Sequence, residues 1–304
     1  MKTSHLLQLL LLSAVWGASF ILIAIAGQSF PPIWVALLRG SFGAVLLWTV
    51  LLIGRHSLPP RSLFPWLFLV ALFNNVIPFT LFALGERTVP SSTAAILNAT
   101  TPIWTLLLSF TVTSTRLTRI MSLGVILGFS GVLLVVYGHS TPQPIAANTT
   151  ITQADFLRGV AFISCAALGY AIATTIAKTK LKGLDPIGLA TTQLSLASLT
   201  VLPIALATRH PAHLTPTTVA AMATLGILGS GLAYLLYYNL LAHISATHVV
   251  AVTYLLPIWG LLWGYLAHET ITWTACTGVA IVIAGLILLN LKPTPNPTPA
   301  SSHN

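Results

Sequence analysis

Nine side chains within the apolar runs of this sequence have the chemistry to bind a polar ligand. Arg39 is charged, and the others carry an amide, a hydroxyl or an indole group: Trp16, Asn74, Asn75, Asn98, Tyr170, Gln193, Tyr234 and Tyr238. A guanidinium binds carboxylates through a planar fork of donors, and amides and hydroxyls exchange hydrogen bonds. These residue types predict a substrate-binding site. They predict no catalytic residue, metal ligand or cofactor, because no nucleophile stands with a base and no metal-ligand spacing occurs.

Arg39 is the most informative of these residues, because it follows Pro32 by about seven residues, roughly 10 Å into a hydrocarbon core of about 30 Å. A buried arginine costs several kcal/mol unless it is hydrated or hydrogen-bonded. No Asp or Glu lies in the core of any apolar run. We therefore expect carbonyls, side-chain amides, water or an anionic substrate group as its partners. Two interpretations stay open: Arg39 anchors its helix or shapes a gate, or it contacts a substrate carboxylate.

The other polar residues also allow two interpretations. Amides and hydroxyls in membrane helices line a cavity, or they join neighbouring helices through bonds worth about 0.6 kcal/mol each. Trp16 and the tyrosines of residues 216–240 either stack on an amphipathic substrate or anchor at the membrane interface. Trp104 and Trp259 lie near the middle of their runs, where helix packing is the expected role.

The composition shows what must position these residues. Of the 304 residues, 56% are hydrophobic and only 6% are charged, whereas a soluble domain carries about a quarter charged residues. Runs of about 20 apolar residues cross the bilayer as helices, and runs that are apolar on every face exclude barrel strands. The sequence predicts an all-α membrane protein with ten transmembrane helices, at residues 5–26, 32–53, 64–85, 90–111, 118–138, 157–178, 186–207, 216–240, 245–267 and 271–291.

The net charge of +9 is explained by a membrane, not by a nucleic acid. With a cytoplasmic N-terminus, most basic residues fall on the cytoplasmic side: Lys2, Arg55, Arg61, Arg116, Arg119, Lys178, Lys180, Lys182 and Lys292. Three face outward: Arg87, Arg158 and Arg209. This asymmetry predicts a multi-pass membrane protein with both termini cytoplasmic. The first run also imitates a secretory signal that ends at Ala24-Ile25-Ala26, but its length and the repeat described next favour a membrane span.

An internal repeat organises the chain. The tripeptide Pro102-Ile103-Trp104 returns as Pro257-Ile258-Trp259, and the same offset of about 154 residues relates Gly124 to Gly278 and Gly131 to Gly285. Each copy has five spans, and because five is odd the second copy enters the membrane from the opposite side. The sequence predicts a first repeat at residues 1–138, an external linker at 139–156, a second repeat at 157–291 and a disordered cytoplasmic tail at 292–304. Inverted repeats place a binding site between the halves near the membrane midplane.

Four residues of these spans are candidates for hinges or close packing. Pro102 and Pro257 should interrupt helical hydrogen bonding and free the carbonyls of Asn98 and Thr253, which line a cavity or permit bending; a static kink is the alternative. Gly124 and Gly128 form a small-xxx-small face suited to close helix contact.

These features together resemble a known family. They are Trp16-Gly17-Ala18-Ser19-Phe20, Arg39 after Pro32, the mid-span prolines, and Glu269 with Thr270-Ile271-Thr272 and Gly278. The ordered set resembles the EamA-type transporters of the drug/metabolite transporter superfamily over residues 5–291. The resemblance implies two five-helix repeats and an inner-membrane exporter of small amphipathic metabolites such as amino acids or their derivatives. The position that matches Glu269 in the first copy is Thr115, so a role shared by two glutamates has no counterpart there.

Energy coupling and other function classes are weighed on the same residues. The first span has no acidic residue, which disfavours proton-coupled drug efflux of the small-multidrug type, and His248 is the only titrating substitute that the sequence suggests. We therefore expect alternating-access transport by facilitated diffusion or exchange. A membrane enzyme is an alternative, but the histidines are scattered and His210 with His213 lacks a third ligand. A structural membrane protein is another, and it gives no reason for a buried arginine. Expected partners are a small-molecule substrate and the lipid bilayer, with a homodimer as an open arrangement.

Overall fold

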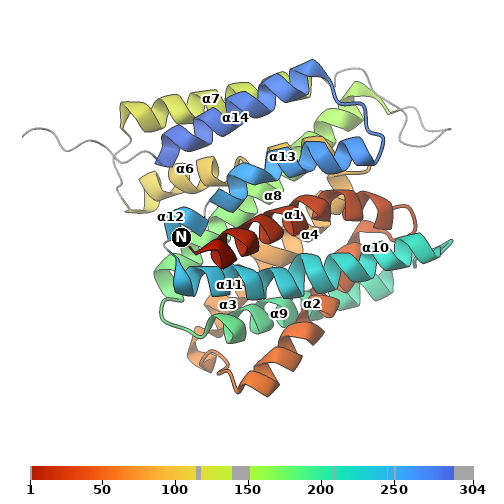
Figure 1. Cartoon of the computed structure of the whole chain (residues 1–304). Helices are drawn as coiled ribbons and strands as arrows, with labels where there is room; N and C mark the ends of the chain where they lie inside the picture. Colours follow the sequence, from red (N-terminus) through yellow and green to blue (C-terminus); the bar gives the residue numbers. More distant parts are fainter. Residues whose placement is uncertain are drawn as a thin grey trace, which may run out of the picture.

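The computed structural model describes residues 2–113, 118–138, 151–208, 210–244, 246–249 and 251–290, and every regular element in them is a helix (Figure 1). The first half contains α1 (Thr3–Ala26), α2 (Pro32–Gly54), η1 (Arg61–Leu63), α3 (Phe64–Ala71), η2 (Leu72–Val76), α4 (Ile77–Gly85), α5 (Ser91–Asn98), α6 (Thr101–Thr113) and α7 (Arg119–Gly138). The second half contains α8 (Gln153–Lys180), α9 (Pro186–Ala207), α10 (Pro216–Gly226), η3 (Ile227–Leu232), α11 (Ala233–His243), α12 (Ala246–Val249), α13 (Ala251–Leu266) and α14 (Trp273–Asn290). The predicted all-α fold class is confirmed.

The ten predicted membrane crossings are present. Within the described residues, nine helical stretches are long and apolar enough to cross a membrane, and the shorter apolar helix α13 occupies the place of the predicted ninth span. Each half therefore crosses five times, and the second half runs in the opposite sense to the first. We call the side on which α1 begins the N-terminal face and the other side the distal face.

The start of the second half differs from the prediction. Helix α8 begins at Gln153, whereas the sequence predicted a start at residue 157. The cause is a capping box: Asp155 N donates to Thr152 Oγ1 over 3.2 Å, and Thr152 N donates to Asp155 Oδ2 over 3.2 Å. Residues 139–150 of the predicted linker, the predicted tail from 292 to 304, and Thr115 lie outside the described residues.

The two mid-span prolines have different local structures. Around Pro102 the fourth span is broken, because α5 ends at Asn98 and α6 begins at Thr101. The Asn98 carbonyl accepts a hydrogen bond of 2.7 Å from Thr101 Oγ1, so the prediction of a free carbonyl is wrong at this position. Pro257 lies inside the continuous helix α13. Pro102 therefore lies at the start of a helix, whereas Pro257 is accommodated within one.

Glycines bring the fifth helices of the two halves into contact, and Figure 1 shows α7 and α14 side by side along one edge of the molecule. A Cβ atom added to Gly124 would lie 2.8 Å from the Gly285 oxygen, and one added to Gly131 would lie 2.6 Å from the Gly278 oxygen. Gly124 and Gly278 are repeat equivalents, as are Gly131 and Gly285, so the repeat exchanges these two contacts with each other. Gly128 approaches the Ile103 side chain, so that α6 also contacts this pair.

Loops at the two opposite faces also make contacts that the repeat relates to each other. At the N-terminal face, Ser57 N donates to Asp185 Oδ2 over 3.1 Å. At the distal face, Ala212 N donates to Ser29 O over 3.2 Å. The repeat offset of about 154 residues maps one contact onto the other with the halves exchanged. Reciprocal contacts of this kind arise when two copies are related by a two-fold axis in the membrane plane, which is the geometry of an inverted repeat.

The third span of each half contains a π-helical segment that the sequence did not predict. Segments η2 and η3 occupy equivalent positions in the two halves, since η2 shifted by the repeat offset falls on η3. Insertions of this kind in an α-helix occur frequently at functional sites. Both segments contribute side chains to the polar cluster described below: Asn74 and Asn75 come from η2, and Ser230 comes from η3.

Candidate functional site

Arg39 marks a polar cluster between the two halves of the chain. It is 7% exposed, its Nε atom donates to Ser230 Oγ over 3.1 Å, and its Cζ atom lies 4.1 Å from the centre of the Phe79 ring. The protein partners of Arg39 are therefore a serine hydroxyl and an aromatic face, and not the expected carbonyls or side-chain amides. The expectation of water or an anionic substrate group as a further partner stays a prediction. No other hydrogen bond to this guanidinium is made in the described part of the chain. Its remaining N–H groups are available to a ligand.

Amide groups form the second part of the cluster. Asn74 Nδ2 donates to Gln193 Oε1 over 3.1 Å and to the Tyr234 hydroxyl over 2.8 Å, and Asn75 Nδ2 lies 3.3 Å from the same hydroxyl. Asn75 is fully buried, and its Oδ1 atom has no partner among the described residues. A buried unpaired acceptor costs free energy that a ligand donor recovers.

The bonds between the halves are reciprocal. Arg39 and Gln193 are repeat equivalents on α2 and α9, and each bonds to the π-helical segment of the other half. Arg39 reaches Ser230 in η3, and Gln193 accepts from Asn74 in η2. Any movement that separates the halves at this level must break or exchange both bonds. The polar cluster therefore holds the two halves together at this level.

Aromatic rings connect the cluster to α1. Trp16 lies 5.6 Å from Tyr237, Tyr237 lies 5.3 Å from Tyr238, and Tyr238 stacks on Tyr234 at 6.1 Å, measured between ring centres. Trp16 and the three tyrosines are half-buried, so part of each ring stays accessible. Tyr170 stacks on Phe82 at 6.0 Å on another side of the cluster.

The structure thus brings most of the predicted site residues together. Asn74, Asn75, Gln193 and Tyr234 share hydrogen bonds, and Trp16 and Tyr238 join them through ring contacts. Arg39 lies close enough to Tyr234 and Tyr170 to interact with them electrostatically. Asn98 lies at the end of α5, where its Oδ1 is buried without a partner in the described structure, and shares no hydrogen bond with the cluster. Ser230 and Phe79 were missed, because a lone serine and a lone phenylalanine in apolar runs carry no distinctive signal.

Glu269 closes the distal face as a helix cap contributed by another segment. Its Oε1 atom accepts from Ser91 N over 2.8 Å and from Ser91 Oγ over 2.6 Å, and its Oε2 atom accepts from Ser92 N over 3.1 Å. A negative charge at a helix N-terminus is stabilising, because the free N–H groups there carry partial positive charge. Glu269 thereby fastens the segment after α13 to the start of α5.

Glu86 is a second distal carboxylate, and no sequence pattern distinguishes it as a site residue. It follows the last residue of α4 beside Arg87, which is typical of an interfacial charge, yet it is only 5% exposed. Neither of its oxygens has a hydrogen-bond partner in the described structure. Burial, and then the nearby Glu269 charge, raise the pKa of Glu86 well above its usual range, and Arg39 opposes them.

A charged contact joins the halves at the N-terminal face. His56 Nδ1 lies 3.0 Å from Asp185 Oδ2, and Asp185 Oδ1 accepts from Ile187 N over 2.9 Å at the start of α9. This aspartate therefore caps α9 and holds the loop that follows α2. His248, the titrating residue suggested by the sequence, lies in α12 and is exposed.

Comparison with known proteins identifies relatives over the whole length. A family model described as the EamA-like transporter family matches residues 3–137 and residues 157–291. An uncharacterized transporter of Archaeoglobus fulgidus is 24% identical over 278 residues, covering 91% of this chain and 95% of the relative. A second one from that organism is 27% identical, covering 96% and 98%. The uncharacterized inner membrane transporter YedA of Escherichia coli is 29% identical over 131 residues, covering 41% and 40%. One solved crystal structure shares the fold, with a TM-score of 0.64 over 95% of this chain and 96% of its own at 16% identity.

Proposed function

Because this chain belongs to the EamA-like transporter family, we propose that it carries a small amphipathic metabolite across the membrane by alternating access. The family match over both halves makes the chain a membrane transporter, with a small molecule as its substrate and lipid around its helices. Export, the substrate class and the mechanism are our proposal. The reciprocal bonds Arg39–Ser230 and Asn74–Gln193 carry it, because they place exchangeable polar contacts between two inverted halves.

The cluster chemistry favours amino acids or their derivatives. The free N–H groups of Arg39 suit a carboxylate, since a guanidinium offers parallel donors to both oxygens. The unpaired Asn75 oxygen suits an ammonium or amide donor. The half-buried rings of Trp16, Tyr234 and Tyr238 offer a surface for an apolar side chain. An anion with an apolar part and a hydrogen-bond donor uses all three features.

The orientation follows from the charges at the two faces. Arg55, Arg61, Lys178, Lys180 and Lys182 are exposed at the N-terminal face, whereas Arg87 and Arg158 lie toward the distal face. We place the N-terminal face in the cytoplasm by the positive-inside rule, with both termini there. The inner membrane is the location that this orientation and the named relative YedA support.

Transport by the reconstituted protein tests the proposal. Liposomes that contain the protein and a mixture of unlabelled amino acids should accumulate labelled amino acids by counterflow. Their uptake should be faster than that of empty liposomes, which contain no protein. Arg39→Lys keeps the charge but loses the planar fork, so the uptake rate should fall about tenfold, which corresponds to about 1.4 kcal/mol. Arg158→Lys is the matched control, because Arg158 is exposed and pairs with Asp155 at 3.4 Å.

Two results would count against these assignments. Wild-type uptake equal to that of empty liposomes, for amino acids and for a panel of other metabolites, would overturn the transport proposal. Equal uptake by the wild type and Arg39→Lys would leave transport standing but remove the bidentate role of Arg39.

A further inference from the structure

The Glu86 carboxylate is left without a role by the fold and by the polar cluster. This carboxylate caps no helix and joins no ion pair among the described residues. It has no hydrogen-bond partner there, even though the residue is buried, with only 5% of its surface exposed. Burying an unpartnered carboxylate in its charged form costs several kcal/mol, and the group usually takes up a proton instead. The position therefore requires an explanation that includes a proton or a cation.

The charged and titratable groups around Glu86 come from few elements. The helices α1, α2 and α8 pack against α4. Helix α2 contributes Arg39, the segment after α13 contributes Glu269, and α8 contributes Tyr170. Toward the start of α8, Asp155 and Arg158 pair with each other in solvent. The distal half of α1 and the whole of α5 contain no titratable side chain.

Glu269 and Glu86 have opposite environments. Glu269 accepts three hydrogen bonds from Ser91 and Ser92 at a helix N-terminus, and these bonds stabilise its charged form. Glu86 accepts none. Two neighbouring carboxylates avoid a double negative charge by sharing it unequally, and the proton resides on the one with the poorer environment. Burial without a hydrogen-bond donor therefore favours the neutral acid at Glu86.

An aromatic layer separates Glu86 from the polar cluster. One turn before Glu86 on α4, Phe82 packs edge-on against Phe20 at 5.5 Å and stacks on Tyr170 at 6.0 Å. One further turn back, Phe79 contacts Arg39. Outward from the cluster, the Arg39 guanidinium therefore comes first, the aromatic layer next and the Glu86 carboxyl group last. Opening the distal face would bring water to Glu86 before it reaches the cluster.

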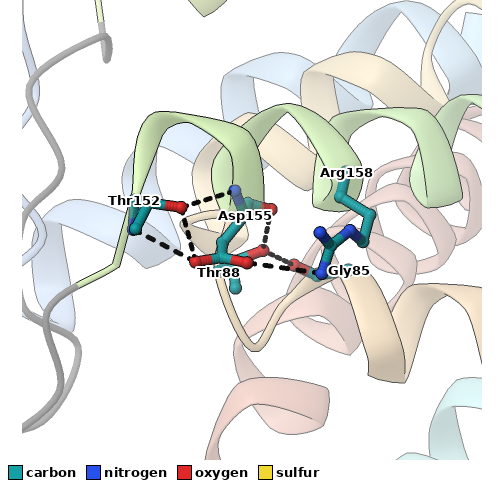
Figure 2. Close-up of polar contacts among 5 residues, drawn as sticks. All are labelled: Gly85, Thr88, Thr152, Asp155 and Arg158. Carbon is teal, nitrogen blue, oxygen red and sulfur yellow. Dashed lines mark hydrogen bonds and ion pairs between the residues drawn. The ribbon is translucent and has the colours of Figure 1, made fainter.

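The two carboxylates are held by different groups of helices. Gly85 packs on Gly159 of α8. Thr88 Oγ1 donates to the Asp155 carbonyl over 3.0 Å, as Figure 2 shows. The loop that carries Glu86 is therefore fastened to α8. Glu269 is fastened to α5 and follows α13, which packs on α1. Movement of α1 and α13 away from α4 and α8 would bring water to Glu86 at the end of α4.

We propose that Glu86 is a proton-binding residue of the distal gate, and that the carrier exchanges one proton with the distal compartment each time this gate opens. The proposal rests on the proposed transport function and adds a pH-dependent step to it. In the step itself, the carboxylic O–H bond of Glu86 breaks, the proton goes to water at the distal face, and the carboxylate keeps the electron pair. Closing the gate requires the reverse transfer.

The direction of the pH effect follows from this step. The closed gate holds the proton more tightly than the open gate, so low pH favours the closed state. As the pH rises above the ordinary range of a hydrated glutamate, the open state gains. Release of one proton on opening changes the ratio of open to closed molecules by up to about tenfold per pH unit.

Spin labels on the two groups of helices measure this ratio without a substrate. Gln28, after α1, and Gln153, at the start of α8, are both exposed near the distal face and outside the gate. They would be changed to labelled cysteines in a chain in which Cys165 and Cys276, both free, are replaced by serine. Distances between the labels, measured in lipid nanodiscs from pH 5 to pH 9, should shift toward longer values as the pH rises.

Variants give the decisive comparison. Glu86→Gln mimics the neutral acid and should keep the short distance across the whole pH range. Asp155→Asn is the matched control, because it removes an exposed carboxylate near the same face, and it should keep the wild-type response. A wild-type distance that does not change with pH, a Glu86→Gln variant that responds like the wild type, or a shift that follows the Na⁺ concentration at fixed pH would overturn the proposal.

The outcome is separable from that of the transport assay. Amino-acid counterflow by the wild type together with pH-independent distances would reject the proton site and keep the carrier. A pH response that Glu86→Gln abolishes, in a protein that moves none of the tested metabolites, would keep the proton site and reject the proposed substrate class.

Discussion

The Glu269 cap offers a direct measure of what holds the distal face closed. Glu269→Gln keeps the shape of the side chain and one acceptor oxygen, but it places an NH₂ group where Oε2 now accepts from Ser92 N over 3.1 Å. One hydrogen bond is lost, and the two bonds from Ser91 change from a charged to a neutral acceptor. Hydrogen bonds to charged groups contribute about 1.5–3 kcal/mol and neutral ones about 1 kcal/mol, so the sum before screening is about 2.5–7 kcal/mol.

Solvent reduces this value, because Glu269 is half-buried. A net loss of about 2 kcal/mol remains after the discount that partial exposure requires. For a chain of this size each kcal/mol lowers Tm by about 2–4 °C, so Glu269→Gln should lower it by about 4–8 °C. The assay is the loss of monodisperse protein on heating, followed by fluorescence-detected size-exclusion chromatography.

A double-mutant cycle with Ser91→Ala isolates the contact. The Ser91 hydroxyl donates to Oε1 over 2.6 Å, so its removal should cost more with Glu269 present than with glutamine there. The same Glu269→Gln variant should lower the pKa of Glu86, because a neighbouring negative charge is gone, so the pH-dependent change in the label distance should be smaller. A Tm change below about 1 °C, or additive effects of the two substitutions, would refute the reasoning.

Three further predictions follow from other contacts. Ser230→Ala and Gln193→Leu each remove one of the two reciprocal bonds, so both should change the Gln28–Gln153 label distance in the same direction; opposite shifts would contradict the reciprocity. Gly131→Ala should lower thermal stability by about 1–3 kcal/mol, since its new Cβ would meet a backbone oxygen, whereas Leu133→Ala, on an exposed side chain, should have little effect in the same heating assay. Burial acts to raise the pKa of Asp185, but hydrogen bonds from His56 and backbone N–H groups outweigh it and hold that pKa below its usual value. Its stabilising contribution is then present above about pH 4 and lost as the pH falls through the lowered value, so Asp185→Asn should flatten the acid limb of an unfolding curve. An acid limb identical to that of the wild type would reject this cap.

The architecture was predictable because its signals are local. A run of about 20 apolar residues has no alternative in lipid to a helix, and the repeated proline and glycine positions reveal the duplication without any knowledge of packing. The polar cluster was predictable for a related reason, since polar side chains in membrane helices converge on one another. Arg39, Asn74, Gln193 and Tyr234 lie together for this reason.

The features that were missed depend on contacts distant in sequence. Glu86 and Glu269 both follow apolar helices, and only the fold shows that one turns inward without a partner while the other caps a distant helix. The break before Pro102 and the continuous helix through Pro257 share one tripeptide, so their difference comes from the surroundings: Thr100 and Thr101 bond the freed carbonyls at the first site. The π-helical segments likewise need backbone strain that no residue type announces.

The reciprocity of the two halves has a thermodynamic consequence. If the halves were identical, exchanging their conformations would turn one end state of the carrier into the other, and the two states would have equal energy. The positions at which the copies differ would therefore set the energy difference between the two states, and Arg39 opposite Gln193 and Glu86 opposite Leu241 are two of them. Both place a charged residue type in the first half alone. Departures from the repeat symmetry would thus make the two faces of this carrier unequal.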